Sequence, residues 1–336
     1  MRKFVRAAAM FAAVALLSTT AACGDDQKKS AGGGQGSALT LTLNWVPYGE
    51  HAPFYYGLKK GWYKDEGIDL TIRPGNGSGN VIKAVDQKQT DVAWADTPTL
   101  LKSIASGMNV KSVGVFLQKG PASVQFLADK NIKSPADLKG KTVGGTPGDA
   151  IYATFPAWLK ANGVDPKDVK VANVDAAGKI AALAEGKVDA IQGFFHDQSP
   201  TIEAKTGKTM DRLLYADWGM NLLGTGIIVH NDTLKAKGDL IRKFIKVTQK
   251  SWTEAAKDVS GAVDAMAELA ENEPAKEILT KQLNLCLPLL DTSGGQPGVN
   301  TEAKWSETID LMAKNADLKD AGSPSKYWDK SFTVAS

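Results

Sequence analysis

The chain has 336 residues, with 40 Lys and Arg against 37 Asp and Glu and only two cysteines. Its first 22 residues carry three of the basic residues and no acidic one, so the remainder has 37 of each and a formal net charge near zero. This balance removes the main argument for a nucleic-acid-binding surface, and we expect no nucleic-acid partner.

Residues 1–22 have the pattern of a secretory signal peptide: a basic start, an apolar segment over 7–17 and small residues before Cys23. The apolar segment is shorter than the ~20 residues that span a bilayer. Cys23 fits a cysteine that receives lipid after cleavage, although Thr20 stands where lipoprotein signals more often carry Leu. We therefore expect an extracytoplasmic protein anchored to the cell membrane by lipid on Cys23. Ordinary secretion is the alternative.

Residues 23–37 are rich in Gly, Ser, Gln and charge, and are predicted to be a disordered tether. If Cys23 carries lipid, Cys286 has no disulfide partner, and its apolar neighbours predict a buried, inert thiol. The three histidines are far apart and lack a second ligand at metal-binding spacing. We expect no metal site and no cofactor.

Short β-rich segments alternate with helical ones as far as residue 230, the α/β pattern of a parallel sheet covered by helices. The predicted strands are 39–44, 68–73, 91–95, 110–116, 123–128, 141–144, 169–174, 188–192 and 225–230. The predicted helices between them are 53–65, 79–87, 97–106, 149–162 and 178–185. The chain then becomes helical, with helices expected over 232–258, 259–271 and 301–314.

Two β/α halves followed by a helical tail are accommodated better by two lobes, each with its own sheet, than by one large sheet. The chain would cross between the lobes at 117–122 and 219–225, which both contain Gly. We expect lobe I over 38–118 plus 225–336, and lobe II over 119–224.

Several segments, in this order and spacing, resemble one known family: LNW-x-P-x-x-x-HAPFY, GWY-x-x-EGIDL, SPADLKGKTVG and EGKVDAI. They are similar to the substrate-binding proteins of ABC importers, more narrowly to the nitrate, sulfonate, taurine and thiamine-pyrimidine group. The resemblance covers 39–250. It implies the two-lobed periplasmic-binding-protein fold of type II, a small-molecule ligand between the lobes, and delivery to a membrane permease and its ATPase subunit. We expect a monomer.

In open α/β sheets, ligands bind beyond the carboxyl ends of the strands. In lobe I the loops at these ends hold the candidate residues Asn44, Trp45, Tyr48, His51, Asp96 and Thr97. Several members of the resembled group have Asp where this chain has Asn44, which disfavours a cation held there. The alternatives are a structural role for Trp45 and helix capping for His51 and Asp96.

In lobe II the candidates are Thr146, Gly148 and Asp149 before a predicted helix, then Phe194, Asp197 and Trp218. Phe194 could face Trp45 across the cleft, while Trp218 could instead brace the hinge. No Arg or Lys occurs within 44–51, 94–97, 145–149 or 194–197. The expected site is therefore aromatic, with no cation nearby.

An aromatic site favours a flat ring with polar edges, such as a thiamine-pyrimidine-like, flavin-like or aromatic-acid ligand. A taurine, alkanesulfonate or nitrate receptor that uses backbone donors is the alternative, and an adhesion or signalling module is a second. Some eukaryotic members of the wider family synthesise the thiamine pyrimidine, but this chain lacks their Cys-rich motif. We expect no enzymatic activity and no catalytic residue.

Overall fold

A computed structural model describes residues 36–149, 151–290, 292 and 295–333. The predicted signal peptide, Cys23 and the tether up to residue 35 lie outside these residues. The first strand begins at Ser37, which was predicted to be the last residue of the tether. Among the helices of the described ranges, none has both the length and the apolar character needed to cross a membrane.

The first of two five-stranded sheets has the order β2-β1-β3-β10-β4, with β10 antiparallel to both neighbours. Its strands are β1 (Ser37–Thr42), β2 (Ile68–Arg73), β3 (Val92–Asp96), β4 (Val110–Val115) and β10 (Thr225–His230). Successive side chains of β3 point to opposite faces, as the pleat requires. Trp94 joins the core beneath α1 (Ala52–Lys59) and α8 (Asn231–Lys257). Ala93 and Ala95 join the core beneath α3 (Ser78–Asp86) and α4 (Thr97–Ala105).

The second sheet has the order β7-β6-β8-β5-β9, with β5 antiparallel to β8 and β9. Its strands are β5 (Ala122–Leu127), β6 (Thr142–Gly145), β7 (Lys170–Asn173), β8 (Ala190–Phe194) and β9 (Met210–Leu214). One face packs on Phe155 and Trp158 of α5 (Phe155–Ala161), and the other on Leu183 of α6 (Ala176–Ala184) and Ile202 of α7 (Phe195–Thr206). Both sheets are therefore covered by helices on both faces, which confirms the predicted fold class. The sheets are mixed and not parallel as expected, because β10 and β5 each run antiparallel to both neighbours.

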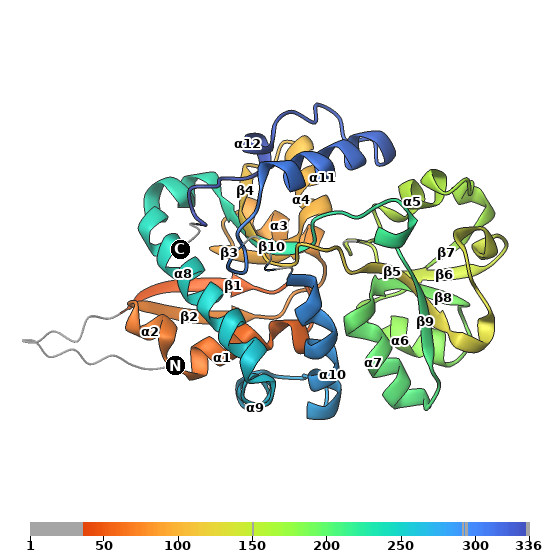
Figure 1. Cartoon of the computed structure of the whole chain (residues 1–336), viewed down its shortest axis with the longest axis horizontal. Coiled ribbons are helices and arrows are strands. Elements are labelled where there is room, and N and C mark those ends of the chain that lie inside the picture. Colours follow the sequence, from red (N-terminus) through yellow and green to blue (C-terminus); the bar gives the residue numbers. More distant parts are fainter. Residues whose placement is uncertain (1–35, 150, 291, 293–294, 334–336) are drawn as a thin grey trace, which may run out of the picture. The chain divides into compact units, whose positions relative to one another are not determined.

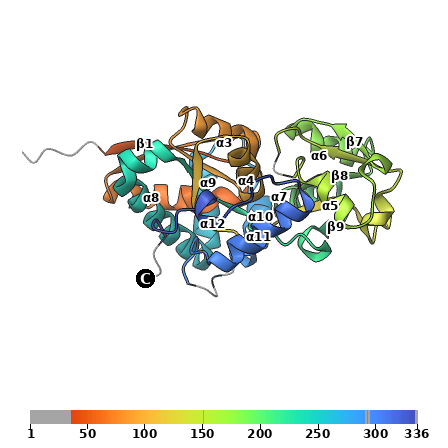
Figure 2. The same ribbon diagram turned by 90° about the horizontal axis from the view of Figure 1, so that it is seen from above.

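The first sheet and the helices around it are called lobe I here, and the second sheet with α5, α6 and α7 is called lobe II (Figures 1 and 2). The lobe II helices are α5 (Phe155–Ala161), α6 (Ala176–Ala184) and α7 (Phe195–Thr206). The lobe I helices are α1 (Ala52–Lys59), α2 (Trp62–Asp65), α3 (Ser78–Asp86), α4 (Thr97–Ala105), α8 (Asn231–Lys257), α9 (Val259–Leu269), α10 (Lys276–Cys286), α11 (Glu302–Asn315) and α12 (Pro324–Tyr327). In both views α10 lies between α9 and α7, so the helical tail reaches lobe II.

The chain passes between the sheets twice, and the two passages lie side by side. The Gly224 N–H donates to the Leu117 carbonyl at 2.8 Å. A Cβ atom at Gly120 would lie 2.8 Å from the Leu222 carbonyl oxygen, so the backbones approach too closely for a larger residue.

Four strands and α-helices were not predicted: β9, α7, α10 and the short α12. β9 carries exposed charges as an edge strand, and α7 contains Pro200 and mostly polar residues, so neither shows clear apolar periodicity. The helix predicted over 149–162 is wrong at its start, because α5 begins only at Phe155, with a proline in its first turn. The helix predicted over 53–65 is divided at Gly61, whose φ of 76° ends the first helical run.

Candidate functional site

A small cavity lies where the carboxyl ends of strands from both sheets meet. Its volume is about 20 Å³, room for about one water molecule. Its walls are Asn44, Trp45, Tyr48, Gly77, Ser78, Asp149, Phe194, Asp197 and Gln198. Six of the predicted site residues are thus brought together, and a ligand ring can enter only if these walls move apart.

The turn after β1 is held by His51. The His51 Nδ1 accepts from the Tyr48 N–H at 3.3 Å, so Nε2 carries the proton and donates to the Asn44 Oδ1 at 2.8 Å. Burial lowers the pKa of His51 to about 3, which keeps the ring neutral. His51 therefore orients Asn44 from behind the cavity wall and makes no capping hydrogen bond to α1.

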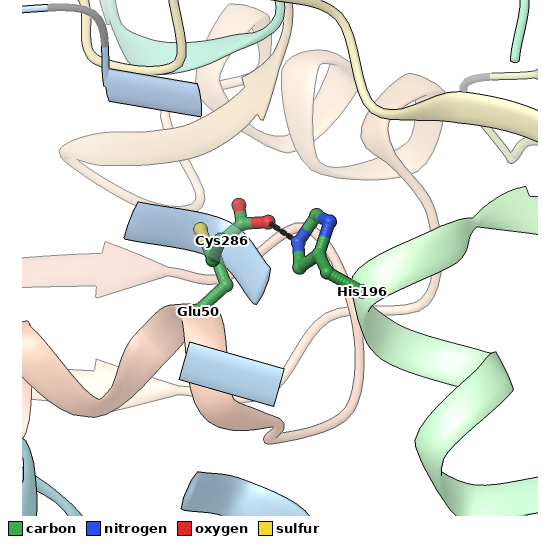
Figure 3. A group of neighbouring side chains, drawn as sticks. All are labelled: Glu50, His196 and Cys286. Atoms are coloured by element: carbon green, nitrogen blue, oxygen red, sulfur yellow. Dashed lines mark hydrogen bonds and ion pairs between the residues drawn. The ribbon is translucent and has the colours of Figure 1, made fainter. Parts of the chain in front are cut away.

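Glu50 is the central buried charge of the site (Figure 3). Its carboxylate accepts from the Tyr48 hydroxyl at 2.7 Å, from the Trp94 Nε1 at 2.5 Å and from the His196 Nε2 at 2.5 Å. Burial alone would raise the pKa of Glu50, but hydrogen bonding to His196 and Tyr48 and the charge of His196 outweigh it and lower the pKa. Because the carboxylate is ionised, the His196 Nε2 must carry the proton of this bond.

The Glu50–His196 bond joins the two lobes, since Glu50 lies in the 3-10 turn η1 (Gly49–His51) and His196 lies in the first turn of α7. A backbone hydrogen bond joins them again, from the Gly79 N–H to the Gly148 carbonyl at 3.1 Å. Gly77, with a φ of 123°, lets these segments meet, because a Cβ there would lie 2.5 Å from the Gly148 oxygen.

Gln282 of α10 forms a further bridge. Its Oε1 accepts from the Gly49 N–H at 2.9 Å, and its Nε2 donates to the Asp197 carbonyl at 2.7 Å. The amide is fully buried, and Gly49 packs so closely on α10 that an added Cβ would lie 2.5 Å from the Leu279 carbonyl oxygen. The helical tail thus positions one site segment from each lobe.

Lys179 of α6 corrects the expectation that the site lacks a nearby cation. Its side chain is fully buried, its Nζ lies 2.7 Å from the Asp149 carboxylate, and it stands 5.0 Å from the centre of the Trp45 ring. A cation over an aromatic face is attracted to it. Lys179 was not predicted to be a site residue, because it lies within α6 and not in a strand-end loop.

Carboxyl groups surround the cavity. Burial raises the pKa of Asp96 and of Asp197 to about 7. Asp96 also caps α4, because its Oδ1 accepts from the Thr99 N–H at 3.1 Å. Of the buried acids, Asp197 and the Lys179-paired Asp149 line the cavity and offer it hydrogen-bond acceptors.

The remaining predicted residues lie around the cavity without lining it. The Thr97 hydroxyl donates to the Gly224 carbonyl at 2.6 Å, beside the second passage between the lobes. Thr146 is buried in lobe II. Trp218 is half-buried against the core, and its carbonyl accepts from the Asn162 side chain. Gly77, Ser78 and Gln198 also line the cavity. Gly77 and Ser78 belong to the 75–80 loop, which the alternative of an anion receptor would use, whereas Gln198 was not predicted.

Cys286 lies beside Glu50 and His196, and ligand atoms of all three are within 4.8 Å of one another (Figure 3). The thiol is buried, as expected, and burial raises its pKa well above the usual value. A metal ion bound here would have to break the Glu50–His196 hydrogen bond and displace the proton of the Cys286 thiol. The arrangement matches a hydrogen-bonded carboxylate–imidazole pair better than a metal centre.

Residues 49–262 match the family described as NMT1/THI5 like. The chain belongs to this family. It is 27% identical over 286 residues to the riboflavin-binding protein RibY of Chloroflexus aurantiacus, covering 82% of this chain and 80% of the relative. It is 22% identical to the formylaminopyrimidine-binding protein of Halalkalibacterium halodurans, covering 80% and 83%. A 4-amino-5-hydroxymethyl-2-methylpyrimidine phosphate synthase of Saccharomyces cerevisiae, THI12, is 26% identical, covering 76% and 77%.

Solved structures show the same fold. The alkanesulfonate-binding protein SsuA from Xanthomonas axonopodis pv. citri, bound to MOPS, has a TM-score of 0.68 at 16% identity and covers 87% of this chain and 98% of that one. The nitrate-binding protein NrtA from Synechocystis has a TM-score of 0.65 at 13% identity, covering 89% and 87%. The predicted resemblance to substrate-binding proteins of ABC importers is confirmed.

Gln282→Leu is expected to weaken ligand binding about fivefold, because it removes the buried hydrogen bond between α10 and the Asp197 carbonyl that forms when the lobes meet, worth about 0.5–1.5 kcal/mol. Titration calorimetry would measure this. Gln249→Leu is the matched control, since buried Gln249 bonds to the Pro297 carbonyl away from the cavity. Equal loss of affinity in both variants would refute a positioning role for Gln282.

Asp197→Asn is expected to change how stability depends on pH. The folded pKa of Asp197 is raised to about 7, so its contribution to the free energy of unfolding is complete below about pH 4 and is lost as pH rises through 7. The variant should match the wild type near pH 4 and exceed it by at least about 1 kcal/mol at pH 8. Urea unfolding across this range would show it, with exposed Asp239→Asn as the control. A difference independent of pH would contradict the assignment.

Proposed function

We propose that the protein is the extracytoplasmic receptor of an ABC importer and binds a flat, nitrogen-containing heteroaromatic ring between its lobes. The observation that carries this proposal is the cavity at the meeting strand ends, whose walls include Trp45, Tyr48 and Phe194 beside buried carboxyl groups. Aromatic faces suit a ring, and carboxyl oxygens suit its N–H and amino groups.

The charge of the site supports a donor-rich ring over an anion. Glu50, Asp96, Asp149 and Asp197 gather around the cavity, and Lys179 is already paired with Asp149. A sulfonate, nitrate or aromatic acid would lie against the Asp149 and Asp197 carboxyl groups of the wall, at an electrostatic cost whenever these are ionised. Relatives that are riboflavin-binding and formylaminopyrimidine-binding by name agree with a ring ligand.

The proposal includes binding without catalysis. Two relatives are named as binding proteins and others as synthases. In this chain Glu50 and His196, whose side chains have the chemistry of an acid and a base, are bonded to each other behind the cavity wall. Their bond fits a role in joining the lobes.

We further propose that the lobes, 38–118 plus 225–336 and 119–224, move about the two adjacent passages to admit the ligand and then deliver it, as a monomer, to a permease and its ATPase subunit. The hydrogen bond between these two adjacent chain segments supports a single hinge. Lipid on Cys23 would hold the receptor beside the permease, with residues 24–36 as a tether.

The ligand class can be tested by thermal shift. We expect formylaminopyrimidine, hydroxymethylpyrimidine or riboflavin to raise the melting temperature, since a ligand at 100 times its dissociation constant adds ~2.7 kcal/mol. Benzoate, taurine and nitrate should not. Trp45→Ala should weaken binding several-fold, because a stacked ring contributes about 0.5–1.5 kcal/mol beyond burial, while half-buried Trp218→Ala serves as the control. A rise in melting temperature with taurine or nitrate alone would contradict the heteroaromatic ligand class and favour an anion receptor. No rise with any compound would favour an adhesion or signalling module.

Cys23→Ser is expected to release the mature protein from membranes into the medium, because one substitution removes the sole proposed lipid attachment site. Fractionation followed by immunoblotting would measure the distribution, with Cys286→Ser as a control that should remain on the membrane. A processed Cys23→Ser protein that still sediments with membranes would show that something else anchors it.

A further inference from the structure

A second, larger hollow adjoins the small cavity on its outer side. Its volume is about 640 Å³, within the range of ~300–1,000 Å³ that is typical of small-molecule sites. Trp45, Asp197 and Gln198 line both hollows. We call the larger one the outer groove. Since three residues border both spaces, a ligand placed against Trp45 would reach from one into the other once the walls separate.

The outer groove is mainly apolar and has walls from both lobes. Val46 and Leu269 of lobe I line it, and Ile180 of lobe II lies across from them. Val46 is 45% exposed and Leu269 is 42% exposed. They are two of the four large apolar residues exposed in the part of the chain that the structure describes. Single exposed apolar residues need no explanation, but two that converge on one groove indicate something apolar that covers them.

The two spaces differ in chemistry as well as in size. The inner cavity offers carboxyl groups and a buried amide network in about 20 Å³, whereas the outer groove offers aliphatic surface and far more room. A single small ring would satisfy the inner groups and leave Val46 and Leu269 in water. A fused ring system would use both, with its hydrogen-bonding edge inside and its apolar ring outside.

We infer that the outer groove is a specificity subsite for a second, apolar ring fused to the ring that the inner cavity recognises. This inference rests on the proposed receptor function and narrows its ligand class to fused heteroaromatic compounds. Burial of the added ring against apolar walls would increase affinity in proportion to the area removed from water.

Two matched pairs of probes test the inference by calorimetry: aminopyrimidine against aminoquinazoline, and uracil against lumichrome. Within each pair the hydrogen-bonding pyrimidine edge is shared, and the second member adds apolar fused rings. At least one fused probe should bind about tenfold or more tighter than its single-ring partner. Val46→Ser and Leu269→Ser should reduce this gain at least about threefold and leave single-ring affinity unchanged.

Val171→Ser and Leu285→Ser are matched controls, because these residues are 42% and 37% exposed and do not line the groove. They should preserve the affinity of every probe. Equal binding of fused and single-ring probes would overturn the subsite and leave the receptor function standing, whereas failure of all ring compounds would overturn both. Groove variants that lower uptake by cells without changing probe affinity would assign the groove to the permease and also overturn the subsite.

Discussion

The buried carboxylate of Glu50 is the interaction on which the arrangement of this molecule depends. An ionised carboxyl group taken out of water is costly unless donors surround it. Tyr48 and Trp94 supply donors from lobe I, and His196 supplies one from lobe II. The pairing of Glu50 is therefore complete only when the lobes meet, and the electrostatics of one side chain become coupled to the closure of the whole protein.

The closed and open states of the lobes are close in free energy, because opening does not leave Glu50 without partners. When the lobes separate, water can replace His196, as the Tyr48 and Trp94 donors stay in lobe I. The same reasoning applies to Gln282, which loses the Asp197 carbonyl and keeps Gly49. Exchange of protein partners for water changes the free energy by far less than the gross strength of the bonds. A ligand that contacts both lobes can then decide which state prevails.

Most strands of this fold can be predicted from the sequence, because the pattern that marks a strand is local. The β-rich segments at 68–73 and 225–230 form β2 and β10 with the predicted bounds. Asp96 caps α4, as its neighbours Thr97 and Pro98 suggest. The strand-end rule also brings Trp45, Asp149 and Phe194 to one cavity. Lys179 and Gln282 could not be found in this way. Their roles come from tertiary contacts of α6 with Trp45 and of α10 with both lobes, and no local pattern marks those contacts.

Lys179 also changes how the charge of the site should be understood. Paired with Asp149, it leaves Asp96 and Asp197 as buried acids whose pKa values are raised to about 7, so near neutral pH each can carry a proton or release it. A protonated carboxyl group donates one hydrogen bond and accepts another, whereas its ionised form only accepts. A ring with adjacent donor and acceptor positions can therefore find a complement in either state. A sulfonate or nitrate only accepts hydrogen bonds and would require these acids to hold their protons. Because the edge of such a ring can complement either protonation state and an anion only the protonated one, these buried acids favour a heteroaromatic edge over an anion.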